Sequence, residues 1–180
     1  DLIGLSVFLI VFASIIFFAP EMGGYFLEAN NFVPADPLVT PSHIAPVWYF
    51  TPFYSILRAV PPIFGSQFPG VAAMGLSVLI FFFIPWLDRS KVRSIRYKGI
   101  LYKKWLAAFV ISFIVLGYLG TVPSNIWGQF SSTIPLLGGL DVATFFARIF
   151  TLVYFLFFIM MPFYSKKDVT KKVPKRVTMR

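Results

Sequence analysis

Cysteine is absent from the 180-residue sequence, histidine occurs once, and charged residues make up only 13%. The lack of cysteine excludes disulfides and metal sites built from thiolates. Soluble domains contain roughly 25% charged residues, whereas this chain is 58% hydrophobic and 19% aromatic. A membrane is therefore the favoured environment, and the length is that of one domain.

Four apolar runs approach the roughly 20 residues of helix that a bilayer requires. They are Leu2–Ala19, Val71–Leu87, Trp105–Val122 and Val142–Phe163. The second run is short and contains Pro85, so we expect it either to recruit Pro69 and Gly70 or to thin the bilayer locally. The sequence thus predicts an all-α membrane protein with four transmembrane helices in a single domain, residues 1–180.

Basic residues gather in two segments of the chain. Seven of the 16 lysines and arginines lie in the loop 88–104, and seven more lie in the tail 165–180. Loops that stay in the cytoplasm carry the excess of basic residues. We therefore expect residue 1, the 88–104 loop and the C-terminus to be cytoplasmic, and the loops 20–70 and 123–140 to be on the opposite side. This placement favours anionic membrane lipid over nucleic acid as the partner of the basic residues.

The segment 20–70 differs from an ordinary solvated linker. Its nine prolines prevent a long helix, yet it also contains ten aromatic residues. Exposing so much apolar ring surface to water is unfavourable, and disorder fits this composition poorly. The pattern predicts a long, ordered extramembrane loop that packs against the helices and shapes a pocket for an apolar, ring-bearing ligand.

Several separated motifs, in the same order along the chain, carry a family resemblance. The central one is Pro41-Ser-His-Ile-Ala-Pro-Val-Trp-Tyr-Phe50, followed by Pro52-Phe-Tyr-Ser-Ile-Leu-Arg58. Others are Asp1-Leu-Ile-Gly4, Asn31 to Pro41, and Pro85-Trp-Leu-Asp-Arg-Ser90. Together they resemble the C-terminal half of bacterial cytochrome b, the quinone-handling subunit of the respiratory ubiquinol–cytochrome c reductase. Because the chain begins inside one of these motifs, we expect upstream sequence to precede Asp1.

The resemblance implies that this chain supplies the last four helices of an eight-helix cytochrome b bundle, located in a bacterial inner membrane. It implies oxidation of ubiquinol, with electron transfer toward cytochrome c coupled to proton translocation. Two b hemes would be ligated by histidines absent from this chain. The implied partners are the N-terminal half of cytochrome b, a Rieske-type iron–sulfur protein and a cytochrome c1-type subunit, in a homodimeric complex. The chain alone is expected to be inactive.

The same resemblance assigns an outer quinol site to the long loop. Its residues are Pro46, Val47, Trp48, Tyr49, Phe50 and Tyr54. The chemistry is consistent, because a quinone ring packs on aromatic side chains and a phenol can hydrogen-bond its oxygen. The residues alone leave a second interpretation open, in which Trp48, Tyr49 and Tyr54 form only an interfacial aromatic belt.

One position departs from the family pattern. Many members have Glu at position 47, where it is proposed to accept a proton from quinol, whereas this chain has Val47. Glu21 and His43 are the candidate acceptors that replace it, with Glu28 and Asp36 as further nearby acids. His43 is alternatively structural, or it helps to dock the iron–sulfur protein. On the inner side, the resemblance assigns Asp1 to a second quinone site.

No catalytic residue and no metal-ligating cluster is assigned with certainty. Arg58 and Arg148 are expected to be structural, and Asp141 is predicted to cap the last helix and to help compensate Arg148, seven residues later. Two other functions remain open: a heme-free structural subunit or a transport subunit of a membrane complex. The transport reading is weakly supported, because apart from Arg148 the predicted spans hold almost no ionisable groups.

Overall fold

The computed structural model of the chain describes residues 2–24, 27, 29–40, 44–63, 65–130 and 140–173. In chain order its helical elements are α1 (Leu2–Phe18), η1 (Met22–Gly24), η2 (Ala29–Phe32), α2 (Thr51–Ala59), α3 (Phe68–Leu79), η3 (Ile80–Phe83), α4 (Ile84–Leu87), η4 (Ile95–Tyr97), α5 (Ile100–Thr121), α6 (Val142–Ile159) and α7 (Met161–Lys167). Within the described ranges there are no strands beyond two isolated bridges. The all-α prediction is therefore confirmed.

Three helices are long and apolar enough to cross a membrane. They are Phe68–Leu87, Ile100–Thr121 and Val142–Ile159, the first of them formed by α3, η3 and α4 in succession. Helix α1, which the sequence predicts as a further span, has 17 residues. That length corresponds to about 26 Å of helix, slightly less than a hydrocarbon core of roughly 30 Å. The crossing of α1 therefore stays a prediction.

Two predicted span starts lie later than the helices actually begin. The helix expected from Val71 begins at Phe68 and so includes Pro69 and Gly70, one of the two alternatives that the sequence left open. Pro69 lies in the first turn, where a missing N–H costs no hydrogen bond. The helix expected from Trp105 begins at Ile100 and includes Lys103 and Lys104. Lysine is a good helix former with a long stem, so it can extend the helix beyond its apolar part.

The last predicted span, residues 142–163, is divided between two helices in the structure. Helix α6 ends at Ile159, and a separate helix, α7, follows from Met161. Pro162 lies in the first turn of α7. Because proline has no N–H and its ring clashes with the preceding turn, it interrupts a helix that hydropathy alone would continue to Phe163.

The core of the molecule is aromatic and lies between α5, α6 and the Phe68–Leu87 helix. The Phe109 ring on α5 lies 4.7 Å from that of Phe157 and 5.1 Å from that of Tyr154, centroid to centroid, both on α6. The Tyr154 hydroxyl donates to the Ser77 carbonyl oxygen at 2.7 Å, which ties α6 to α3. Buried Tyr thus contributes ring packing and also satisfies its polar end.

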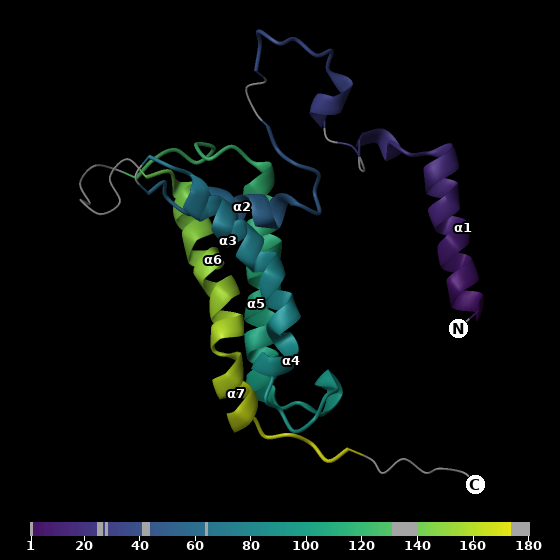
Figure 1. Ribbon diagram of the computed structural model, residues 1–180, viewed down its shortest axis with the longest axis vertical. Helices are drawn as coiled ribbons and strands as arrows, with labels where there is room; N and C mark the ends of the chain where they lie inside the picture. Colours follow the sequence, from purple (N-terminus) through teal and green to yellow (C-terminus); the bar gives the residue numbers. More distant parts are fainter. Residues whose placement is uncertain are drawn as a thin grey trace.

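Helix α1 stands apart from this bundle (Figure 1). No residue of α1 is buried. Its two serines, Ser6 and Ser14, donate their hydroxyl hydrogens to the carbonyl oxygens of Leu2 and Ile10 at 2.9 and 2.7 Å. A helix that satisfies its own polar groups and exposes apolar side chains all round is suited to lipid or to contact with other helices.

Candidate functional site

The residues assigned to the outer site form one turn followed by one short helix. Pro46 and Val47 lead into a turn in which the Phe50 N–H donates to the Val47 carbonyl oxygen at 2.9 Å. The Thr51 hydroxyl then donates to the Trp48 carbonyl oxygen at 2.6 Å. We name residues 46–50 the aromatic turn. Its backbone is fixed by hydrogen bonds to the start of α2, so its side chains project from a rigid base.

Helix α2 lies across the end of the bundle, against the upper parts of α5 and α6 (Figure 1). Its inward face buries Thr51, Pro52, Ser55, Ile56 and Ala59. The approach to α5 is so close that a Cβ added at Gly120 would overlap the carbonyl oxygen of Thr51. Glycine is required where two backbones come this near. The aromatic turn is therefore held by direct backbone contact with a long helix.

Two arginines complete the attachment of α2. The Arg58 side chain donates through Nη1 to the Val122 carbonyl oxygen at 3.0 Å. Arg148 on α6 donates through Nε to the Ala59 carbonyl oxygen at 3.0 Å. Both bonds satisfy carbonyl groups at helix ends, which lack partners within their own helices. The contacts agree with the structural roles predicted for both arginines.

Asp141 does not compensate Arg148 in the way the sequence suggests. It occupies the N-cap position of α6, as predicted, but its side chain makes no capping hydrogen bond. Its Oδ1 atom is buried without a hydrogen-bond partner. Arg148 contacts the carbonyl end of α2 instead. Arg148 has this partner because the tertiary structure brings the end of α2 close to α6. The spacing of residues along α6 gives no sign of this acceptor.

The rings of the aromatic turn are largely accessible. Trp48 is 58% exposed and Tyr49 is 56% exposed, and their ring centroids lie 5.6 Å apart in an edge-to-face arrangement. Tyr54 on α2 is half-buried. Its hydroxyl donates to the Ile44 carbonyl oxygen at 3.4 Å, and Arg58 lies 5.5 Å from its ring. The turn thus presents aromatic edges and faces next to a positioned phenol.

The predicted proton acceptors are not gathered around this turn. Glu21 is exposed, and within the described ranges its carboxylate has no hydrogen-bond partner. Asp36 accepts a hydrogen bond from the Leu38 N–H at 2.9 Å, inside its own loop. His43 and Glu28, as well as Asp1 of the inner site, lie outside the described residues. Val47 is half-buried and has no ionisable group.

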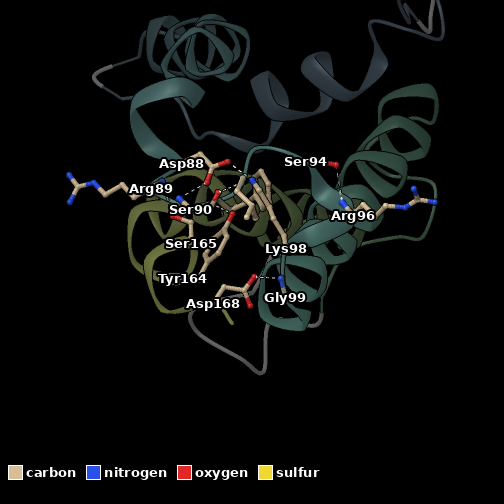
Figure 2. Close-up of polar contacts among 12 residues, drawn as sticks. Asp88, Arg89, Ser90, Ser94, Arg96, Lys98, Gly99, Tyr164, Ser165 and Asp168 are labelled. Carbon is tan, nitrogen blue, oxygen red and sulfur yellow. Dashed lines mark hydrogen bonds and ion pairs between the residues drawn. The ribbon is translucent and has the colours of Figure 1, made fainter. Parts of the chain in front are cut away.

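A polar cluster lies at the other end of the bundle, around the start of α5 (Figure 2). Lys98 is 3% exposed and forms an ion pair with Asp88. Its Nζ atom also lies 3.7 Å from the Tyr102 ring centroid. Burial acts to raise the pKa of Asp88, but hydrogen bonds from Lys98 and Ser90 outweigh it, and the pKa of this carboxyl is below its usual value. Nearby, Asp168 accepts the Gly99 N–H at 2.6 Å.

A heme held by two histidines does not fit the residues of this chain. The sequence contains a single histidine, His43. In the part of the chain that the structure describes, no group of three or more His, Cys, Asp or Glu side chains is placed to hold a metal ion. Any bis-histidine heme of the intact protein must therefore take its ligands from other sequence.

Sequence reasoning identified the aromatic turn but missed the elements that hold it. The helical state of α2 has a local signal, because Pro52 stands in the first helical turn and buried positions recur on one face. The Asp88–Lys98 pair has no comparable signal. Its two residues are separated by a loop whose course depends on bonds such as that from the Arg89 N–H to the Ser165 hydroxyl at 3.0 Å.

Comparisons with known proteins agree on one family. The family model described as cytochrome b (C-terminal)/b6/petD matches residues 34–155, which include the aromatic turn and α2. Cytochrome b of Allochromatium vinosum is 53% identical over 178 residues, covering 99% of this chain and 39% of that protein. Cytochrome b/c1 of Bradyrhizobium diazoefficiens is 36% identical over 179 residues, covering 99% of this chain and 23% of that protein.

The fold has a counterpart among solved structures. A chain of a hyperthermophilic respiratory Complex III superposes with a TM-score of 0.64 at 33% sequence identity. The match covers 90% of this chain and 35% of that chain. The present chain therefore spans about two fifths, or less, of the length of these relatives.

Proposed function

The chain belongs to the family of the C-terminal half of cytochrome b, and from this we propose that it supplies the quinol-oxidising region of a cytochrome bc complex. In the intact protein, electrons from ubiquinol would pass toward cytochrome c, coupled to proton translocation across the membrane. The observation that supports this function is the aromatic turn, whose exposed rings stand on a backbone fixed to α2.

The turn would bind quinol through its rings. Trp48 and Tyr49 offer an edge and a face at right angles, and the quinol ring would pack against them, with Phe50 and Tyr54 lining the site. Half-buried Pro46 and Val47 would form its apolar wall. Because Thr51 and Gly120 hold the backbone, binding would require little reorganisation, which favours a single orientation of the reacting ring.

The protons of quinol would leave through a group other than residue 47. Glu21 and His43 are the proposed acceptors, and Glu21 is exposed to solvent as an exit group must be. Replacing each by Gln separately in the full-length complex tests this. The true acceptor should change the pH dependence of quinol oxidation, and a residue whose replacement leaves rate and pH profile unchanged is not the acceptor.

The remaining predictions about the intact protein form part of the same proposal. Helix α1 would be a fourth span, and Asp1 would belong to an inner quinone site. The loops 20–70 and 123–140 would face the periplasm, with the C-terminus in the cytoplasm of a bacterial cell. The N-terminal half of cytochrome b would bring two b hemes, and a Rieske-type protein and a cytochrome c1-type subunit would complete a homodimeric complex.

A visible spectrum tests the proposed function most directly. The native membrane complex would be isolated through this chain, and its quinol-reduced minus oxidised spectrum recorded. Bands of b-type heme that respond to quinol are expected. Their absence from an intact, active preparation would contradict the proposal and favour a heme-free structural or transport subunit.

A pair of tryptophan variants separates the quinol site from an interfacial belt. Trp127 is 47% exposed and stacks on Tyr118 at 6.2 Å between ring centroids, so it is a matched control for Trp48. In the full-length complex, Trp48→Ala should lower quinol oxidation by roughly ten-fold through lost ring contacts of about 1–1.5 kcal/mol. Trp127→Ala should leave the rate close to wild type. Equal effects would assign both rings to the belt.

A further inference from the structure

Helix α4 passes into the basic loop at the end of the bundle opposite α2 (Figure 1), and a cavity lies at this junction. Its volume is about 400 Å³, and it is lined by Ile84, Pro85, Asp88, Ser90, Val92 and Arg93. The first two residues belong to the last turn of the candidate span Phe68–Leu87. The others belong to the loop that follows. The cavity is therefore apolar on the side of the membrane span and polar on the side of the loop.

The charge of the cavity is positive despite the presence of Asp88. Both carboxylate oxygens of Asp88 are occupied, because Oδ2 pairs with Lys98 and Oδ1 accepts the Ser90 N–H at 3.1 Å. The Arg93 side chain, by contrast, has no hydrogen-bond or ion-pair partner among the described residues. An unpaired guanidinium in such a cavity is suited to bidentate binding of phosphate oxygens.

The surroundings distinguish a lipid from a free anion. Trp86, which follows the cavity-lining Pro85 in the chain, is 72% exposed, and Phe82 and Phe83 are exposed one turn earlier. Tryptophan is enriched where a helix meets the headgroup region, and the exposed phenylalanines offer apolar surface to acyl chains. The Arg89 side chain extends outward from the same loop (Figure 2), where it adds positive charge at the membrane surface.

We propose that this cavity binds the headgroup of an anionic membrane phospholipid, with Arg93 on the phosphate and the acyl chains along the outside of α4. Basic pockets beside membrane helices are known to hold such headgroups. The role of the Asp88–Lys98 pair would be to shape the pocket while keeping the Asp88 charge away from the ligand. This site is independent of the proposed quinol reaction.

The test uses the full-length protein in nanodiscs of phosphatidylcholine containing a minor fraction of phosphatidylglycerol. After detergent extraction, the phosphatidylglycerol that stays with the protein is measured by mass spectrometry. Arg93→Gln should retain about five-fold less than wild type, the effect of roughly one basic contact at a membrane surface. Arg96→Gln is the matched control, because it removes the same charge from the same loop but does not line the cavity.

The possible outcomes distinguish specific binding of the headgroup in the cavity from non-specific electrostatic attraction between the lipid and the basic loop. Loss in Arg93→Gln with retention in Arg96→Gln supports the proposal. Equal loss in both variants would show only surface electrostatics, and no retention by wild type would remove the site; either result overturns the proposal. Displacement of the lipid by inorganic phosphate at equal concentration would overturn it too, because the site would then recognise a free anion. None of these results depends on quinol oxidation.

Discussion

The two ends of the helical bundle are held together by different chemistry. At the α2 end, attachment depends on close backbone contact at Gly120 and on bonds from Arg58 and Arg148 to carbonyl oxygens. At the basic end, it depends on the Asp88–Lys98 ion pair and on the bond from the Gly99 N–H to Asp168. Among the described residues, Asp88–Lys98 is the only ion pair.

Because the two ends are attached in different ways, different side chains stay available for binding: the rings of the aromatic turn at one end and the arginines of the basic loop at the other. Backbone acceptors secure α2 without using the rings of the aromatic turn, and backbone carbonyl oxygens do not titrate. At the basic end, Asp88 pairs with Lys98, and among the described residues the neighbouring arginines form no ion pair, which suits them to the lipid contact proposed above. We therefore expect the basic end to respond to pH and to charge-changing substitutions, and the α2 end to respond to changes in volume.

The largest effect is expected from Lys98→Met. The substitution leaves the Asp88 carboxylate, partly buried at 18% side-chain exposure, without its cationic partner. Breaking a buried pair in this way typically lowers the free energy of unfolding by about 3–5 kcal/mol, and we expect the lower part of that range. Thermal unfolding of the full-length protein measures it.

The double variant Asp88→Asn with Lys98→Met is its control. It removes both charges, so most of the lost stability should return. A Lys98→Met variant as stable as wild type would mean that the ion pair contributes little, and the contrast between the two ends would then be wrong.

The second-largest loss of stability is expected at the α2 end, from Gly120→Ala. The new methyl group would overlap the Thr51 carbonyl oxygen, so α2 must move, at a cost of about 1–3 kcal/mol. Because the aromatic turn is bonded to Thr51, quinol oxidation should fall together with the unfolding temperature. Gly117→Ala is the control, since its Cβ would meet Pro52 at an ordinary 3.5 Å. Equal tolerance of both variants would contradict the close approach.

Acidification should destabilise the basic end of the bundle before it destabilises the α2 end. The pKa of Asp88 in the folded protein lies below its usual 3.8. A lowered pKa contributes stability that is present above 3.8 and is lost as the pH falls through the folded value. Proteolysis within the 88–99 loop should therefore increase in that acidic range, earlier than proteolysis next to α2. In Asp88→Asn the pH dependence of proteolysis should disappear. If it persists, protonation of a different carboxylate causes it.

The smallest effect is expected from Gly99→Ala. A Cβ at this position would overlap the Asp168 carboxylate and the Val169 carbonyl oxygen. These atoms belong to the tail after α7, which can move more easily than a packed helix, so the loss of stability should stay below about 1 kcal/mol. Hydrogen exchange should become faster at Lys171, whose N–H donates to the Tyr97 carbonyl oxygen at 2.8 Å. Gly75→Ala, with open space around its Cβ, should leave the exchange rate at Lys171 unchanged.

Much of the fold follows from local patterns. Hydropathy located the three membrane-length helices, and the placement of lysine and arginine marked the loop 88–104 as a distinct region. Helix ends were less predictable, because Lys103 extends α5 beyond its apolar part and Pro162 divides the last apolar run. Both differences between an apolar run and the helix bounds arise where a single residue outweighs the average hydropathy of its neighbours.

The sequence predicts which residues form the candidate site, whereas the positions of these residues in space come only from the tertiary structure. The motif around Pro46 and Trp48 indicated a ring-binding turn, and the structure places these residues in one turn next to α2. The partners of Arg148 and Lys98 were not predictable, because each depends on how distant helices cross. The contact of Arg148 with Ala59 joins residues far apart in the chain, which spacing along one helix cannot indicate.

The sequence by itself determined that this chain is helical, apolar and a member of the cytochrome b family, because hydrophobic runs, charge placement and motifs are local properties. Only the tertiary structure decided that Gly120 brings α2 against α5, that Arg58 and Arg148 secure it, and that Asp88 is matched to Lys98. The physical reason is that backbone contacts and buried charge pairs form between segments whose separation in space is set by packing, not by order along the chain.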